Sequence, residues 1–194
     1  MKKSIGIGVV CVAVAAFGYY YLGSRPEKHA GADIPTFLQQ PITPVWKEFQ
    51  PENGSFTVLF PGNVMHATAT KPYGHPNEVT KYDTYSARGS DGTLYTLSEV
   101  QYPQSFDTKD PNAIFQSLIQ NIVASAATTE IIGQTITTFS NHPAVDFNLQ
   151  NLKYASIGRA ILVGKTLYVL TVMSPNLNGL EEHFHAFADS LTLK

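Results

Sequence analysis

The chain has 194 residues, and its 13 basic and 15 acidic side chains give a formal net charge of −2 at pH 7. The Lys and Arg residues are scattered, so the chain has no basic patch for a nucleic acid, and we expect no nucleic-acid partner. The one cysteine, Cys11, lies in an apolar run near the start. No disulfide can therefore form within the rest of the chain, which excludes a disulfide-stapled scaffold.

The first strong feature is the run Ile5–Leu22, which has no charged residue and is preceded by Lys2 and Lys3. As a helix rising about 1.5 Å per residue it would extend about 27 Å, close to the hydrocarbon thickness of a bilayer. The triplet Tyr19–Tyr21 near its end is typical of a membrane interface. We predict that residues 1–22 form one transmembrane anchor.

Two other interpretations of this run stay open. A cleaved secretory signal also has a basic start, and Ala13–Ala16 can supply its cleavage site. A buried helix of a soluble protein is the third possibility. The flanking charges balance, with Lys2 and Lys3 against Arg25 and Lys28, but the stretch before the run is very short. We therefore expect a single-pass protein of the cytoplasmic (inner) membrane whose C-terminal domain lies outside the cytoplasm.

Residues 23–45 form a spacer between this run and the rest of the chain. It contains four prolines and little helical or alternating periodicity, which favours extended, semi-rigid chain. Residues 46–194 then have the usual length of one domain and are enough to enclose a core. We predict an anchor, a linker and a single folded domain.

The first half of this domain predicts strands followed by a helix. Apolar residues alternate over Ser55–Phe60 before a Pro-Gly stop, and two β-rich segments, 80–87 and 93–101, are joined as a hairpin. Asp110 is suited to cap a helix that begins with a proline, and apolar residues then recur at helical spacing over Ile114–Val123.

The second half predicts four strands and a final helix. The last two strands are separated by Gly164 and Lys165, the length of a tight hairpin loop. Apolar residues at helical spacing from Leu180 to Leu191 mark the helix. The four predicted strands are Thr129–Phe139, Ala144–Gln150, Lys153–Val163 and Thr166–Met173. The order of elements predicts an α+β fold, in which helices cover both faces of an antiparallel sheet.

Three motifs carry a resemblance to a known family. The stretches Gly54–Gly62, Gly158–Val172 and Phe187–Leu191 resemble the "G-x-F-x-V-x-x-P-G" opening, the "R-x-x-x-x-x-x-x-L-Y-x-L" hairpin and the "F-x-x-S-F" close of widespread bacterial exported proteins. Those proteins are similar to the α/β/α sandwich of the PsbP-like photosystem II extrinsic subunits. Leu191 stands where Phe is usual. The resemblance implies a binding or accessory domain and no particular reaction, and we do not carry a photosynthetic role over.

The histidines near the C-terminus do not predict a metal site. His183 and His185 are two residues apart, so on a helix they point about 200° apart, whereas Glu181 and His185 share a face. The H-x-x-x-H spacing of zinc enzymes is absent. We expect a solvated polar face and no bound metal.

Two further histidines precede prolines and are predicted to be turn residues in extended conformation, namely His75 and His142. Asp146 follows the second of them closely and offers a His and Asp pair to a serine such as Ser140 or Ser98. No G-x-S-x-G elbow accompanies these serines, so the turn interpretation is preferred over a hydrolase site.

Arg159 lies on an otherwise apolar strand and is expected to pair with Glu99 or Asp146, or else to grip an anionic ligand. The tyrosines suggest an amphipathic contact surface, although strand propensity explains them equally well. They are Tyr73, Tyr82, Tyr85, Tyr95, Tyr102, Tyr154 and Tyr168.

These observations predict a membrane-anchored extracytoplasmic interaction or assembly factor without catalytic activity, with a protein partner. No phosphate loop, paired C-x-x-C or dinucleotide fingerprint is present, so we expect no cofactor. One alternative is a carrier of small ligands or lipids, with a groove closed by the helix Ile114–Val123. Another is a hydrolase or metal-dependent enzyme using His142, Asp146, His183 and His185. The expected contact residues are Arg159, Tyr95, Tyr168, Tyr73, His75 and His142.

Overall fold

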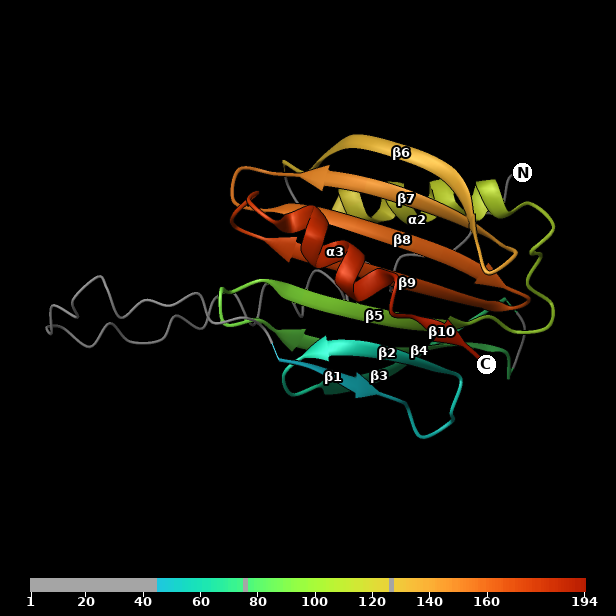
Figure 1. The fold of residues 1–194 in the computed structure, drawn as a ribbon. Coiled ribbons are helices and arrows are strands. Elements are labelled where there is room, and N and C mark those ends of the chain that lie inside the picture. Colours follow the sequence, from blue (N-terminus) through green and yellow to red (C-terminus); the bar gives the residue numbers. More distant parts are fainter. Residues whose placement is uncertain (1–44, 75–76, 126–127) are drawn as a thin grey trace, which may run out of the picture.

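The computed structural model describes residues 45–74, 77–125 and 128–194, and its main element is a seven-stranded antiparallel sheet. The sheet confirms the predicted α+β class. Its strand order is β3-β4-β5-β9-β8-β7-β6, which leaves β3 and β6 at the two edges (Figure 1). In that order the strands are β3 (Met65–Pro72), β4 (Val79–Arg88), β5 (Leu94–Gln101), β9 (Thr166–Ser174), β8 (Ala155–Val163), β7 (His142–Gln150) and β6 (Glu130–Phe139).

One face of the sheet is covered by α3 (Leu180–Ala188) together with a small three-stranded sheet. The small sheet contains β1 (Trp46–Phe49), β2 (Phe56–Pro61) and β10 (Thr192–Leu193), with β2 in the middle. In Figure 1 these elements lie in front of the large sheet. The opposite face carries the second helix, α2, behind the upper strands.

The helix α2 (Pro111–Ser125) begins as predicted. The Asp110 carboxylate accepts a hydrogen bond of 3.1 Å from the backbone N–H of Ala113, which satisfies one of the free donors of the first turn. Pro111 occupies the first helical position, where a missing N–H costs nothing. The apolar side of the helix, which is buried against the sheet, consists of Ile114, Phe115, Leu118 and Ile119.

Each face of the large sheet therefore has its own hydrophobic core. On the α3 face, the alternation of β2 buries Phe56, Val58 and Phe60, as expected from the sequence. The Phe60 ring packs against Phe187 of α3 at a centroid distance of 5.0 Å. The central strand β5 is buried on both faces, which is why its sequence shows no polar alternation.

Two turns form for reasons that the sequence gives. Gly164 has a φ of 58° in the two-residue loop between β8 and β9, which confirms that predicted hairpin. Ser140 and Asn141 have φ values of 49° and 65° and form the turn between β6 and β7. His142, predicted to lie in a turn, is instead the first residue of β7 and pairs with Phe139. It keeps the extended conformation that a following proline requires.

Three strands were not predicted, namely β1, β3 and β10. The β3 sequence is dominated by small residues and ends in Lys71 and Pro72, so its alternation is weak. The other two pair only with β2, and β10 has two residues. Short strands at the rim of a layer are held by these pairings and carry little periodicity of their own.

The expected membrane segment Ile5–Leu22 and the spacer up to residue 44 lie outside the described residues. Within the described ranges, no helix has both the length and the apolar character needed to cross a bilayer. The described part of the chain thus begins at Val45, immediately before β1.

Candidate functional site

Arg159 of β8 forms ion pairs with two carboxylates on the α3 face. Its Nε and Nη2 atoms donate to the two carboxylate oxygens of Asp146 at 2.7 and 3.0 Å, and its Nη1 donates to Asp189 at 3.0 Å. Asp146 lies opposite Arg159 on β7, whereas Asp189 is the C-cap residue of α3. Of the two partners expected for Arg159, the structure selects Asp146 and adds Asp189.

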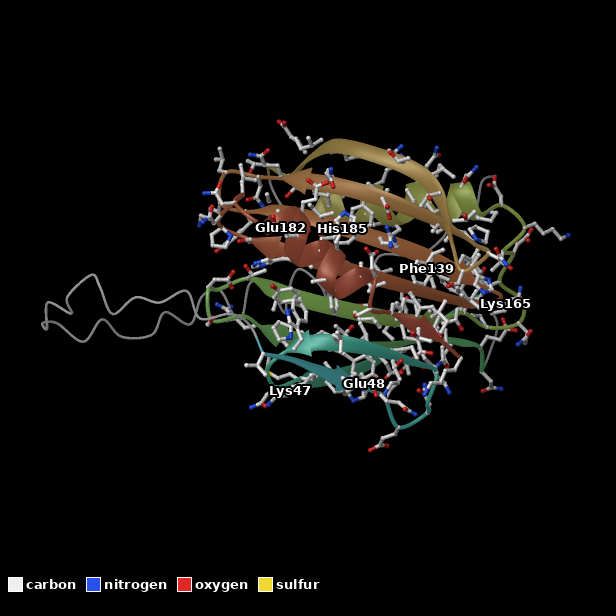
Figure 2. The ribbon with its side chains drawn as sticks, in the orientation of Figure 1. Lys47, Glu48, Phe139, Lys165, Glu182 and His185 are labelled. Carbon is white, nitrogen blue, oxygen red and sulfur yellow. The ribbon has the colours of Figure 1, made fainter. Side chains whose placement is uncertain are left out.

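The surroundings of Arg159 hold this guanidinium in place. Its central carbon lies 5.6 Å from the ring centroids of both Phe139 and Phe184, and the side chain is 12% exposed. The hydrogen bond to Asp146 is the main reason why the pKa of Arg159 is raised above its ordinary value. Phe139 and His185, which contact Arg159 and Asp189 respectively, are labelled in Figure 2.

The charge of this cluster argues against an anion site. Arg159 contributes one positive charge, whereas Asp146 and Asp189 contribute two negative charges. An anionic ligand would have to displace a carboxylate that already forms a bidentate pair. His185 binds the other oxygen of Asp189 at 3.0 Å, so the cluster links β7, β8 and the end of α3.

Tyr95 lies in the interior and connects the sheet to the start of α3. Its ring has no exposed surface, and its hydroxyl is 2.8 Å from Nδ1 of His183. The same nitrogen is 3.6 Å from Asp91 in the β4–β5 turn, and the Trp46 ring packs edge-on against Tyr95 at 5.4 Å. Burial raises the pKa of Tyr95 well above 10. Tyr95 is therefore a core residue, whereas we expected it on a contact surface.

Tyr168 is also interior and lies beside a buried carboxylate. Glu99 is 2% exposed, and its oxygens accept hydrogen bonds from Ser55 at 3.1 Å, Gln101 at 3.2 Å and Tyr168 at 3.5 Å. Asn53 donates at 3.3 Å as well. Burial, followed by the charge of Glu99, raises the pKa of Tyr168 to about 12. Neutral donors thus satisfy Glu99, as a buried acceptor requires.

The remaining expected contact residues do not join these two tyrosines. Tyr73, between β3 and β4, is half-buried and packs against Phe106 at a centroid distance of 5.6 Å. His142 is half-buried at the start of β7. His75 lies outside the described residues. The five described residues of this set therefore form no single patch.

The residues of the alternative catalytic site do not meet directly. Asp146 and His185 belong to one cluster but are linked only through Arg159 and Asp189, whereas His183 contacts Tyr95. His183 and His185 point apart, as the helical spacing predicts. Within residues 45–74, 77–125 and 128–194, no group of three or more potential metal ligands comes together.

The groove expected under α2 is filled. Ile114, Phe115, Leu118 and Ile119 pack directly against strands of the sheet, and Val145, Phe147 and Val169 belong to the same core. Ligand sites need concave apolar space, and between the apolar side of α2 and the sheet, core side chains occupy it.

Exposed apolar residues gather instead along the outer strand β6. Ile131, Ile132 and Ile136 are 44%, 59% and 56% exposed, and we call these three residues with the free side of β6 the β6 edge. Two cavities of about 220 Å³ flank it. The cavity on the α3 face is lined by Ile132, Leu177 and Glu181 among others, and the cavity beside α2 by Ile131, Gln134 and Ile119 among others.

The β6 edge was not identified from the sequence, which predicted the strand but not its neighbours. The signal available was its composition. Over Glu130–Phe139 the strand has one charged residue, no proline, and isoleucines that include an adjacent pair. An interior strand with both faces covered can have the same low content of charge and proline. Only the strand order shows that β6 lies at the edge of the sheet.

Comparison with known proteins gives one informative likeness. No protein-family model and no curated protein matches the sequence. The solution structure of cyanobacterial PsbP (CyanoP) from Synechocystis sp. PCC 6803 superposes with a TM-score of 0.52 at 10% identity, over 88% of this chain and all of that one. A Pseudomonas aeruginosa protein of unknown function, PA94, described as a putative regulator, covers 72% of this chain and 88% of its own at a TM-score of 0.37 and 9% identity.

At 10% identity, the likeness to CyanoP shows a common fold and nothing about activity. It agrees with the resemblance carried by the three motifs at Gly54–Gly62, Gly158–Val172 and Phe187–Leu191. The large antiparallel sheet with helices on both faces is also the architecture that this resemblance implied. The described domain therefore has a PsbP-like fold.

Proposed function

We propose that this chain is a membrane-anchored extracytoplasmic interaction or assembly factor that works without catalysis. The observation that carries the proposal is the contrast between the charged clusters and the exposed apolar residues. The charged clusters around Arg159 and Glu99 are occupied by contacts within the domain, whereas the β6 edge leaves three isoleucines exposed. Exposed apolar groups beside an unpaired strand are typical of a protein contact.

The anchor in this proposal rests on the sequence. The uncharged run Ile5–Leu22 is long enough to cross a bilayer, and the spacer 23–45 then separates the domain from the membrane. The full-length chain should stay in the pellet when membranes are washed with alkaline carbonate. Release of the full-length chain, or digestion of its domain by protease added from the cytosolic side, would contradict the anchored topology.

The interaction role has its own test. A photoreactive amino acid is placed at Ile136 on the β6 edge and, in a separate variant, at Thr68 on β3, an exposed position on the opposite edge of the sheet. After irradiation of cells, we expect one discrete adduct from position 136 and none from position 68. Equal labelling from both positions, or no adduct from either, would refute a specific interaction through this surface.

A further inference from the structure

The two edges of the large sheet differ in how they are protected against pairing. β3 contains Lys71, Pro72 and His66, which binds Asp83 at 2.9 Å. Charged side chains and proline on an edge strand prevent another strand from adding to it. β6 has ten residues with one charge, Glu130 at its first position, and no proline. By charge and proline content β6 is the less protected edge, and beyond the register shift between Ile131 and Gly133 its pairing is regular as far as Phe139.

The space next to β6 suits an added strand. Side chains of a strand point alternately to the two faces of a sheet. On one face, the cavity lined by Ile132 and Leu177 is open next to α3, and on the other, the cavity lined by Ile131 and Gln134 is open next to α2. The first cavity extends over β7 and β8, and the second is lined by three glutamines and two isoleucines, so a strand that pairs with β6 finds apolar contacts on the α3 face and mixed contacts on the α2 face.

We propose that the partner at this edge is a second copy of the chain, paired antiparallel through β6. This inference rests on the proposed interaction role and names its partner. An antiparallel pair of identical strands is related by a two-fold axis, so the contact is closed and does not propagate into a fibre. The two sheets then join into one continuous sheet.

The charge pattern of β6 fits this self-pairing. If the two-fold axis passes through Gln134, Glu130 faces Thr138 of the second copy, and if it passes through Thr135 or Ile136, Glu130 lies beyond the end of the second copy's β6. Glu130 is the one charged residue of the strand, so no two carboxylates oppose each other. Like charges directly opposite each other destabilise strand pairs, and this arrangement avoids them.

The same geometry is compatible with two membrane tethers. A two-fold axis that relates antiparallel neighbours in one sheet is normal to the sheet, so equivalent layers of the two copies lie on the same side. The chain enters each domain at β1, which belongs to the layer on the α3 face. Both entry points therefore lie on one side of the continuous sheet, as two chains rising from one membrane require.

Cysteine cross-linking of the full chain in detergent tests this pairing. Cys11→Ser removes the native thiol, and Gln134→Cys, Thr135→Cys or Ile136→Cys then places one thiol at each possible position of the axis. We expect one of the three variants to form a disulfide-linked dimer on mild oxidation, because directly opposite residues approach to a Cβ separation of about 4.5 Å, which a disulfide can span. The matched control Thr68→Cys on β3 should stay monomeric.

The mass of the uncross-linked chain provides the second measurement. Sedimentation in detergent should give two copies for the wild type, and Ile136→Lys should reduce this to one copy without changing the circular dichroism. A monomeric wild type, or a dimer that survives Ile136→Lys and cross-links through β3, overturns the inference. A photo-adduct at position 136 whose mass differs from two copies would overturn self-pairing and leave the interaction role supported.

Discussion

Gly158→Ala is the substitution whose effect the structure defines most sharply. Gly158 of β8 lies directly opposite Phe147 of β7, and a Cβ built on it would be 2.3 Å from Cζ and 2.5 Å from Cε2 of that ring. It would also be 3.0 Å from the carbonyl oxygen of Leu170. Carbon atoms prefer separations of about 3.5–4.0 Å, so the ring would have to retreat by about 1 Å.

The ring has little room to retreat. Phe147 is 1% exposed and packs in the core beneath α2, where voids are small. Overpacking of a well-filled core costs about 1–3 kcal/mol, and the fixed backbone oxygen places this case near the upper end. We expect Gly158→Ala to lower the free energy of unfolding by about 3 kcal/mol. The assay is urea unfolding of the full-length chain in non-ionic detergent, followed by circular dichroism and Trp46 fluorescence.

The chain offers a matched control for this substitution. Gly133 also lies in a strand of the same sheet, and a Cβ there would meet nothing within 4 Å. Gly133→Ala should be neutral or stabilise by up to about 1 kcal/mol. In a Phe147→Leu background, Gly158→Ala should cost at least about 1 kcal/mol less than in the wild type. Equal effects of Gly158→Ala and Gly133→Ala would refute the steric reasoning.

Two further predictions concern charge. Arg159→Met keeps the stem of the side chain but leaves the half-exposed Asp146 carboxylate unpaired, so urea unfolding should show a loss of about 2–3 kcal/mol. The second concerns alkaline pH, because burial raises the pKa of both Tyr85 and Tyr168 from 10 to about 12. The folded state retains these protons, whereas the unfolded chain loses them near pH 10. The contribution of the two tyrosines to the free energy of unfolding is therefore fully present below pH 10 and is lost as the pH rises toward 12.

Each of these has its own control. Asp189→Asn removes a single bond of Arg159 at an exposed carboxylate, and it should cost less than about 1 kcal/mol. Arg159→Met would contradict the reasoning if it were no more harmful than Asp189→Asn. For the alkaline prediction, urea midpoints and tyrosinate absorbance are compared in wild type and Tyr168→Phe. Above pH 10, Tyr168→Phe should reduce the slope of the unfolding free energy against pH by up to about 1.4 kcal/mol per pH unit. An unchanged slope would show that Tyr168 ionises freely in the folded domain.

The parts of the fold that the sequence predicted are those determined by local chemistry. The cap at Asp110, the loop at Gly164 and the alternation from Phe56 to Phe60 each depend on residues within a few positions of one another. The motifs also indicated the PsbP-like fold, which the likeness to CyanoP confirms. The short strand β10 had no local signal, since it is held only by its pairing with β2.

The candidate site could not be predicted because it depends on which segments become neighbours. Arg159 could be matched to Asp146, which is 13 residues away, but Asp189, 30 residues away, joins it only through the position of α3. Tyrosine in a strand is compatible with a core or a surface, and Tyr95 and Tyr168 proved to be buried. In the same way, the exposure of Ile136 follows from the edge position of β6 and from no local pattern.

The small sheet has a consequence for how the polypeptide matures. β2 near the beginning of the domain pairs with β10 at the very end, and the N–H of Leu59 donates to the hydroxyl of Ser190, 131 residues later. Partial chains that have not yet reached α3 and β10 lack this closing layer, so the aromatic side chains Phe56 and Phe60 remain incompletely covered until those segments have been synthesised. The domain can therefore complete its native structure only after β10 has left the ribosome, and a deletion of β10 would leave a product prone to aggregation and proteolysis.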